Sequence, residues 1–402
     1  MSGITLKRSL GLPLVALYGL GNILGAGIYV LVGKVAGFAG TSTTVAFLIA
    51  MITATFTAFS YMELAGRYPV SASASVYLHK AFAKRWLSVF IGLAMVAGGI
   101  ASAAALSQGF AGYVKTFIQV PPLIASVALL LILGAIAIKG IGESAKTAAI
   151  LTAVEVSGLL IVIWAGRGAL SSVELSSFTA IDPAVGASGI IAGAFLAFYA
   201  FIGFEDMVNV AEETKHPERT MPLAILIALI ASTVLYLLVV IVATGIVPAA
   251  ELATSTAPLA LVFERTGAGN VAILGLIGMI ATVNGIIVQI IMGSRILYGL
   301  ARQGWIPRSL SKVHPELKTP IPATVLVVAA MIAATILLPL VSLAQLTSLL
   351  VLSIFALVNA ALITIKRRTP KHAGFITVPL AVPIVGMMLC IAMIGYQLYS
   401  WA

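Results

Sequence analysis

Eleven stretches of this chain are each long and apolar enough to cross a lipid bilayer. The hydrocarbon core is about 30 Å thick, so a spanning helix needs about 20 mostly apolar residues. Backbone groups in that core find no water, so a lipid-exposed span must be helical or part of a closed barrel. The predicted spans are residues 12–34, 41–64, 87–113, 121–139, 146–166, 186–209, 221–247, 269–298, 321–340, 344–365 and 377–401. Spans of this length predict an all-α integral membrane protein.

The composition leaves no room for a separate water-soluble domain. Hydrophobic residues make up 61% of the 402 residues, and charged residues make up only 9%. Soluble domains of ordinary type carry about 25% charged residues. Residues 1–402 are therefore predicted to form a single transmembrane domain, whose partner is the lipid bilayer.

The basic residues predict how this domain is oriented. With the N-terminus inside, 19 of the 23 Lys and Arg residues fall in cytoplasmic segments, and the exceptions are Lys34, Lys115, Arg167 and Arg265. Basic loops stay on the cytoplasmic side of a membrane. The net charge of +10 thus reflects topology, and nucleic acid is not expected as a partner. A multi-pass protein of the cell inner (plasma) membrane is predicted, with the N-terminus cytoplasmic and the C-terminus outside.

Two of the spans are interrupted by glycine. The first contains Gly21, Gly25 and Gly27, and the sixth contains residues 201–205, Phe-Ile-Gly-Phe-Glu. Glycine weakens a helix, and a break at this depth is tolerated where it is packed in protein or lines a cavity. The first cluster alone is better explained by close helix packing. Corresponding breaks in two halves, however, indicate the binding site of a secondary transporter.

The spacing of the two breaks also predicts a repeat. Residues 1–166 and 186–365 each hold five spans, and each group begins with an interrupted one. Five is an odd number, so the second group runs through the membrane in the opposite sense. The expected architecture is a pair of inverted five-helix repeats (helices 1–5 and 6–10) with broken helices 1 and 6, plus an eleventh helix at 377–401.

The breaks have complementary chemistry. N–H groups of Gly25, Ala26 and Gly27 would open the second half of helix 1, where amides and the helix dipole favour a carboxylate. Free carbonyls between Tyr199 and Ile202 would receive an ammonium group. An anion site that faces a cation site suits the zwitterion of an α-amino acid.

Several stretches resemble the amino acid–polyamine–organocation superfamily, which has the leucine-transporter-type fold. They are GNILGAGIY at 21–29, GIGESA at 140–145, FYAFIGFE at 198–205, AEET at 211–214, PERTMP at 217–222, RILYGLARQG at 295–304 and KTP at 318–320. The match follows the family order over nearly the whole chain. The resemblance implies an amino acid permease that is built on two broken helices.

The resemblance also implies roles for particular residues. Amides of Ala26 and Gly27 would hold the substrate carboxylate, carbonyls of Ile23 and Ile202 would hold its amino group, and Tyr199 would cover it. With the glycines that open the breaks, the predicted substrate-binding residues are Ile23, Gly25, Ala26, Gly27, Tyr199, Ile202 and Gly203.

Two departures from the family pattern bear on mechanism. Relatives commonly have twelve helices, whereas eleven are predicted here. The twelfth helix is therefore either absent or not recognised from the hydropathy of the sequence. Some relatives carry a lysine twelve residues after the glutamate that corresponds to Glu143, and this chain has Glu155 there. A lysine that mimics a bound sodium ion is therefore excluded.

Ionisable residues at membrane depth are costly and point to function. Burial favours the neutral form of Glu155, so this carboxyl is a candidate for proton exchange; the alternatives are a partner near helices 1 and 8, or a water-filled vestibule. Glu205 follows the second break, where relatives use a carboxylate in proton-linked gating. Thr282 and Asn284 would supply oxygens to a coupling-ion site, although packing hydrogen bonds explain each of them better.

No histidine or carboxylate spacing suggests a metal site, and no catalytic motif or cofactor site is visible, so an enzyme is not expected. The predicted function is secondary active transport of L-amino acids, as proton-coupled symport or exchange. An amine or polyamine transporter of the same fold, and a passive channel or facilitator, are the alternatives. The particular amino acid and the oligomeric state stay open.

Overall fold

The computed structural model describes residues 8–25, 27–69, 74–140, 145–171, 181–369 and 376–402. The described residues form helices and connections, with no strand beyond one isolated bridge between Leu10 and Thr214. Nine helical stretches among them are long and apolar enough to cross a membrane. One of these, Leu12–Arg67, contains two of the predicted spans, and a further apolar helix, Ile321–Leu337, is slightly shorter. Each of the eleven predicted spans therefore coincides with helix, and the all-α membrane class is confirmed.

The membrane-length elements follow the predicted boundaries within a few residues. In chain order they are α1 (Leu12–Leu24) with α2 (Gly27–Ala39), α3 (Thr43–Arg67), α5 (Arg85–Val114), α6 (Pro122–Lys139), α7 (Ala145–Ala165), α9 (Gly186–Phe198) with the 3-10 helices η3 (Tyr199–Phe201) and η4 (Phe204–Glu213), α10 (Pro217–Ile246), α13 (Ala272–Arg302), α14 (Ile321–Leu337), α15 (Leu340–Arg368) and α16 (Ala381–Trp401).

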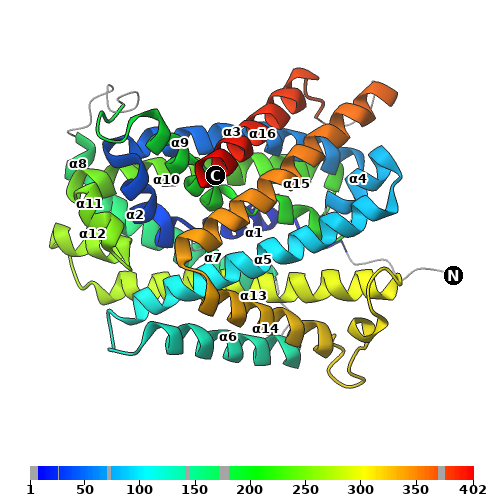
Figure 1. The fold of residues 1–402 in the computed structure, drawn as a ribbon, viewed down its shortest axis with the longest axis horizontal. Coiled ribbons are helices and arrows are strands. Elements are labelled where there is room, and N and C mark those ends of the chain that lie inside the picture. The colour runs from blue at the N-terminus through cyan, green and yellow to red at the C-terminus, as the bar shows by residue number, and fades with distance from the viewer. Residues whose placement is uncertain (1–7, 26, 70–73, 141–144, 172–180, 370–375) are drawn as a thin grey trace.

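Short helices lie at the two ends of the bundle. They are η1 (Gly40–Ser42), α4 (Ala74–Phe82), α8 (Arg167–Ser171), α11 (Ala249–Thr254), α12 (Pro258–Thr266) and η5 (Arg308–Ser311). Figure 1 shows α4 at one end of the bundle and α8, α11 and α12 at the opposite end. We call these the α4 end and the α11 end.

Proline sets the start of several helices. Pro122, Pro217 and Pro258 each stand in the first turn of their helix, where the missing N–H would have no helical partner in any case. The apolar length that follows each proline then determines whether the helix spans the membrane, as α6 and α10 do, or stays short, as α12 does.

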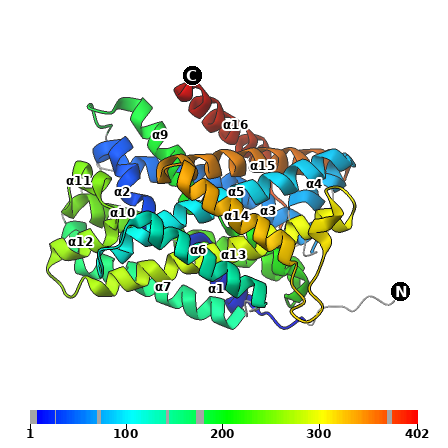
Figure 2. The same ribbon diagram turned by 60° about the horizontal axis from the view of Figure 1, so that its bottom comes forward.

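The broken elements lie inside the bundle and the unbroken ones surround them. α1 packs against α7 and α10, and α2 packs against α9 and α11. The long helices α5 and α13 lie side by side, with α6 and α14 beside them (Figure 1). α16 packs on α15 and α3 at the edge of the bundle (Figure 2). This arrangement places both breaks at the centre.

The outer surface is that of a lipid-facing protein. Apolar side chains such as Leu131, Ile150 and Ile230 are more than half exposed. Trp86 near the start of α5 and Trp164 near the end of α7 are also exposed, as expected of aromatic residues at the membrane–water interface. Apolar exposure of this extent would be costly in water but is neutral against acyl chains.

Candidate functional site

Both predicted helix breaks are present. α1 ends at Leu24, and Gly25 leaves the helical region with φ −27° and ψ 134° before α2 begins at Gly27. In the second element, Ile202 is extended and Gly203 has φ +129°. A side chain rarely adopts that φ, so the second break depends on glycine.

The two breaks are in direct backbone contact. A Cβ atom on Gly203 would lie 2.9 Å from the backbone nitrogen of Ile23 and closer still to the carbonyl of Asn22. A Cβ atom on Gly27 would lie 2.9 Å from the Cα atom of Ala200. Each break thus uses a glycine to bring its backbone against the other. Elements almost 180 residues apart in the sequence form one site.

Tyr236 on α10 joins the two breaks through its hydroxyl group. The hydroxyl oxygen lies 2.7 Å from the carbonyl oxygen of Ile23 and 2.9 Å from that of Ala200, and Tyr236 is fully buried. A single phenolic proton is shared between the two acceptors. The Ile23 carbonyl, predicted to receive a substrate ammonium, is therefore occupied by this hydroxyl in the present conformation.

The amides at the first break are not free. The Gly25 N–H donates to the carbonyl of Gly21 at 2.9 Å, which completes the last turn of α1, and the Gly27 N–H donates to the carbonyl of Gly25. The prediction that these two amides face the cavity unpaired is wrong for this conformation, because the chain closes local turns around the break. Ala26, the third predicted donor, lies outside the described residues.

A cavity of about 50 Å³ lies between the breaks and the helices α5 and α13. A volume of this size admits a few water molecules. Its walls include six predicted site residues: Ile23, Gly25, Tyr199, Ile202, Gly203 and Asn284. Gly27 is not among them, because it packs against Ala200.

Tyr199 and Ser102 close one wall of this cavity. The two hydroxyl oxygens lie 2.8 Å apart, and the Tyr199 hydroxyl also lies 3.2 Å from the Ser102 carbonyl oxygen. The bond fastens the second break to α5. An aromatic at this position was predicted to cover the substrate, and Tyr199 does line the cavity.

A second cavity of about 40 Å³ extends toward the α4 end. Four residues line both cavities, namely Ser102, Ile202, Asp206 and Gln289. Glu205 lines the second cavity, and its carboxylate accepts a hydrogen bond of 2.8 Å from the Gly203 N–H. Glu205 thus caps the backbone where η4 begins. η4 is a 3-10 helix of ten residues, and 3-10 runs beyond three or four residues are uncommon and often mark hinges.

Glu155 is buried on α7 and pairs with α13. Its Oε1 atom accepts a hydrogen bond of 2.9 Å from Asn284 Nδ2, and its backbone carbonyl accepts one from the Tyr29 hydroxyl on α2. The other oxygens, Glu155 Oε2 and Asn284 Oδ1, are buried without a hydrogen-bond partner among the described residues. Asn284 lies on the eighth predicted span, so Glu155 has a hydrogen-bond partner on that helix.

Thr282 does not share this environment. Its hydroxyl donates back to its own helix, at 2.8 Å to the Met279 carbonyl and 3.2 Å to the Gly278 carbonyl. Such bonds satisfy a hydroxyl inside an apolar helix. These are packing hydrogen bonds of the kind predicted for Thr282, and the ion-site role of its oxygen stays a prediction.

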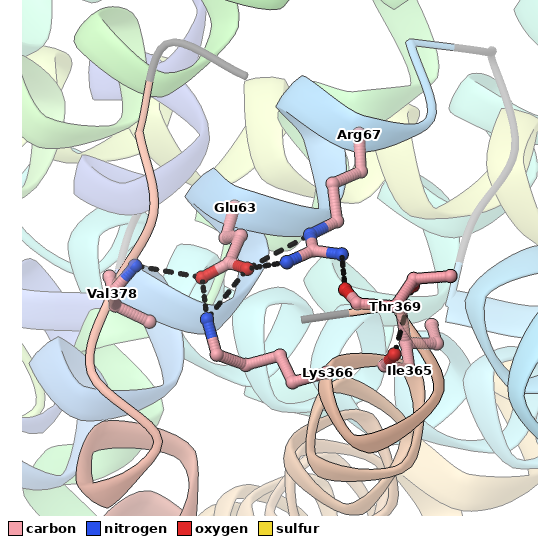
Figure 3. Close-up of polar contacts among 6 residues, drawn as sticks. All are labelled: Glu63, Arg67, Ile365, Lys366, Thr369 and Val378. Carbon is pink, nitrogen blue, oxygen red and sulfur yellow. Dashed lines mark hydrogen bonds and ion pairs between the residues drawn. The ribbon is translucent and has the colours of Figure 1, made fainter. Parts of the chain in front are cut away.

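Buried charges also occur away from the cavities, in a network around Glu63 (Figure 3). The Glu63 carboxylate receives hydrogen bonds from Arg67, from Lys366 at 2.8 Å, and from the Val378 N–H at 2.8 Å. Arg67 also donates to the Thr369 carbonyl. The network joins α3 to α15 and to the segment before α16, so Arg67 serves this junction.

A larger cavity of about 340 Å³ lies at the α11 end. Lys34 lines it and donates to the carbonyls of Ala253 at 2.5 Å and Ser255 at 3.2 Å. The ammonium group thereby ties α2 to the C-terminal end of α11. This contact holds the region after α10 against the broken element.

Several polar cavity or bridging residues were not assigned a role from the sequence, among them Asn22, Ser102, Asp206, Tyr236 and Gln289. Each is a polar residue inside an apolar stretch, which is the signal that identifies them. Hydropathy alone did not separate them from other polar residues of the spans, because it does not state which side of a helix faces the cavity.

Comparison with known proteins identifies the family to which the chain belongs. Residues 10–399 match the protein family described as amino acid permease. The matched region includes both breaks and all of the membrane-length helices up to residue 399 of α16.

Individual relatives are similar over most of their length. The branched-chain amino acid permease BcaP of Bacillus subtilis is 31% identical, over 97% of this chain and 88% of the relative. The methylthioribose transporter of the same species is 27% identical, over 96% and 88%. The chloroplastic cationic amino acid transporter 9 of Arabidopsis thaliana is 32% identical over 78% of this chain, and the match spans 58% of that longer protein.

Proposed function

The chain belongs to the amino acid permease family of membrane transporters, and from this membership we propose that it carries out secondary active transport of L-amino acids, by proton-coupled symport or exchange. One observation carries the proposal. Two interrupted helices meet backbone to backbone at a cavity in the centre of the bundle. Paired interruptions at the midplane are where secondary transporters bind substrate.

The substrate would bind at the main-chain groups of the breaks. Its ammonium group would replace the Tyr236 hydroxyl at the Ile23 carbonyl, and its carboxylate would approach the N-terminal end of α2. The local bonds of Gly25 and Gly27 would open as this happens. Binding would therefore exchange internal hydrogen bonds for bonds to the ligand, which links occupancy to the conformation of α1 and α2.

Coupling would operate through Glu155. A proton on Oε2 would be a donor beside Asn284 Oδ1, and neither of these two oxygens has a hydrogen-bond partner among the described residues. Loss of this proton would leave a buried charge beside Asn284. Because α1–α2, α7 and α13 meet at this residue, the charge change would shift their packing. Glu205, which caps the second break, is the other carboxylate that we assign to coupling.

The predicted orientation and repeat belong to this proposal. α3 ends at Arg67 and α5 begins at Arg85, on either side of α4, which supports a cytoplasmic α4 end. Residues 1–166 and 186–365 would be the inverted repeats, and 377–401 the additional helix. The cell inner membrane, a cytoplasmic N-terminus and an outside C-terminus follow from the same assignment.

Transport into proteoliposomes tests the proposal against a facilitator. Purified protein is reconstituted, and a radiolabelled mixture of amino acids is offered with and without an inward proton gradient. Accumulation above the external concentration that collapses with a protonophore supports coupled transport. Uptake that stops at equilibrium in every condition identifies a passive facilitator, and uptake of polyamines without amino acids identifies the alternative substrate class.

A further inference from the structure

Asp206 is a buried carboxylate that faces the junction of the two central cavities. It lies in η4, one residue after Glu205, is 5% exposed, and lines both cavities. Its backbone N–H bonds the Gly203 carbonyl at 3.2 Å, but its carboxylate accepts no hydrogen bond from any described residue. Glu205 differs, because its carboxylate is bonded to the Gly203 N–H.

The described residues of the cavity walls bring no positive charge near Asp206. Among the described residues that line either cavity there is no Lys, Arg or His. The neighbouring Glu205 has the same sign of charge. A buried carboxylate without a partner is costly, and a cation offsets the cost when it comes within hydrogen-bond distance. The cavity is therefore suited to a ligand that brings its own cation.

The cation in question is not the α-ammonium group. Main-chain carbonyls at the breaks already provide for that group under the proposed function. Asp206 also lines the second cavity, whose walls include Met95 and Met292. Methionine side chains adapt to a flexible aliphatic chain. An amino acid held at the breaks would lay an aliphatic stem along this wall and bring a terminal charge to the carboxylate.

We propose that Asp206 is a specificity determinant that selects amino acids with a positively charged side chain, of the lysine, ornithine and arginine class; the inference rests on the proposed amino acid site. The carboxylate forms a charge-assisted hydrogen bond with the terminal ammonium or guanidinium group. Neutral side chains of equal length leave Asp206 unpaired and bind more weakly.

The test compares ligands that differ in the terminal charge alone. Binding of lysine and norleucine, and of arginine and citrulline, is measured by thermal shift and calorimetry on the purified full chain. The wild-type protein is expected to bind lysine at least about tenfold more tightly than norleucine. Asp206→Asn is expected to bring that ratio close to one, whereas Asp206→Glu keeps the preference because it keeps the charge.

The Glu264→Gln variant is the matched control for Asp206→Asn. Glu264→Gln removes an exposed carboxylate on α12, far from the cavities in sequence and element, and should leave the ratio unchanged. Equal affinity for lysine and norleucine in the wild type overturns the role of Asp206 while the amino acid site stands. Failure to bind any α-amino acid overturns the proposed function instead. If Asp206→Asn does not fold, the wild-type ratio and Asp206→Glu decide the question.

Discussion

Asn284 on α13 donates a hydrogen bond of 2.9 Å to Glu155 on α7, although the two residues are 129 positions apart. The Tyr29 hydroxyl on α2 bonds the backbone carbonyl of the same glutamate. Glu155 on α7 is therefore bonded to α13 through its carboxyl group and to α2, half of a broken helix, through its backbone carbonyl. A change in the protonation of its carboxyl group would act directly on the contact between α7 and α13, next to the bond that α2 makes.

Glu155→Gln should flatten the pH dependence of uptake. The glutamine retains an oxygen that accepts from Asn284, but it cannot gain or lose a proton. We expect wild-type uptake into proteoliposomes to rise as the external pH falls from about 8 to about 5, since protonation relieves the buried charge. In the variant, uptake should vary little over that range, while substrate binding measured by thermal shift persists.

The exposed Glu264→Gln variant is the control for Glu155→Gln, and its pH profile should match the wild type. A profile that is unchanged in Glu155→Gln would exclude this residue from coupling and leave Glu205 as the candidate. Uptake that requires a sodium gradient and ignores pH would contradict proton coupling altogether.

Gly203→Ala should damage the site and the fold together. Gly203 has φ +129°, and an added Cβ would meet the backbone of Asn22 and Ile23. Backbone strain of this kind costs about 1–3 kcal/mol, so we expect the melting temperature to fall and substrate binding to be lost. Gly395→Ala on α16 is the control, because a Cβ there meets nothing within 4 Å. Full binding in Gly203→Ala would show that the contact between the breaks is dispensable.

Tyr236→Phe should destabilise the empty protein and strengthen the response to ligand. Removal of the hydroxyl leaves the carbonyls of Ile23 and Ala200 without their donor, at a cost of about 1–3 kcal/mol. A substrate ammonium would then fill a vacant acceptor and displace nothing. We expect a lower melting temperature without ligand and a larger shift with saturating amino acid. A smaller ligand shift than in the wild type would contradict competition at the Ile23 carbonyl.

Glu63→Gln should lower stability strongly. The substitution leaves the buried Arg67 and the partly buried Lys366 without their counter-charge, and breaking a buried pair in this way costs about 3–5 kcal/mol (Figure 3). Glu251→Gln is the matched control, because its partner Arg265 is 56% exposed and such pairs contribute about 0–1 kcal/mol. Denaturant unfolding in detergent micelles measures both. Similar losses in the two variants would contradict the role of burial.

Asp182 should make a pH-dependent contribution to stability at the α11 end. Hydrogen bonds from the Thr41 N–H, the Ala184 N–H and the Thr41 hydroxyl lower the pKa of this carboxyl. A lowered pKa in the folded state means that the stabilisation is present above the unfolded value of about 3.9 and is lost as the pH falls through the folded value. The difference in melting temperature between wild type and Asp182→Asn should therefore shrink below about pH 4. A difference that is constant with pH would argue against this contact.

The sequence by itself determined the helices and their interruptions. The apolar length of each span predicted a transmembrane helix, because a lipid-exposed segment of that length and composition crosses a bilayer as a helix. Glycines at 25 and 203 located both breaks, and a basic charge bias predicted the orientation. These are local properties of the chain, and they can be read without knowing any neighbour.

The tertiary structure decided which polar groups meet at the site. The pairing of Glu155 with Asn284, the Tyr236 hydroxyl at the Ile23 carbonyl, and the unpaired carboxylate of Asp206 depend on how each helix is rotated and how far it is shifted along its axis. The amide of Gly25 was predicted to be free, but it bonds Gly21, because the packed breaks still allow α1 to complete its last turn. Hydropathy contains little information about rotation within a span that is apolar all round, so these partners emerge from the packing of the whole bundle.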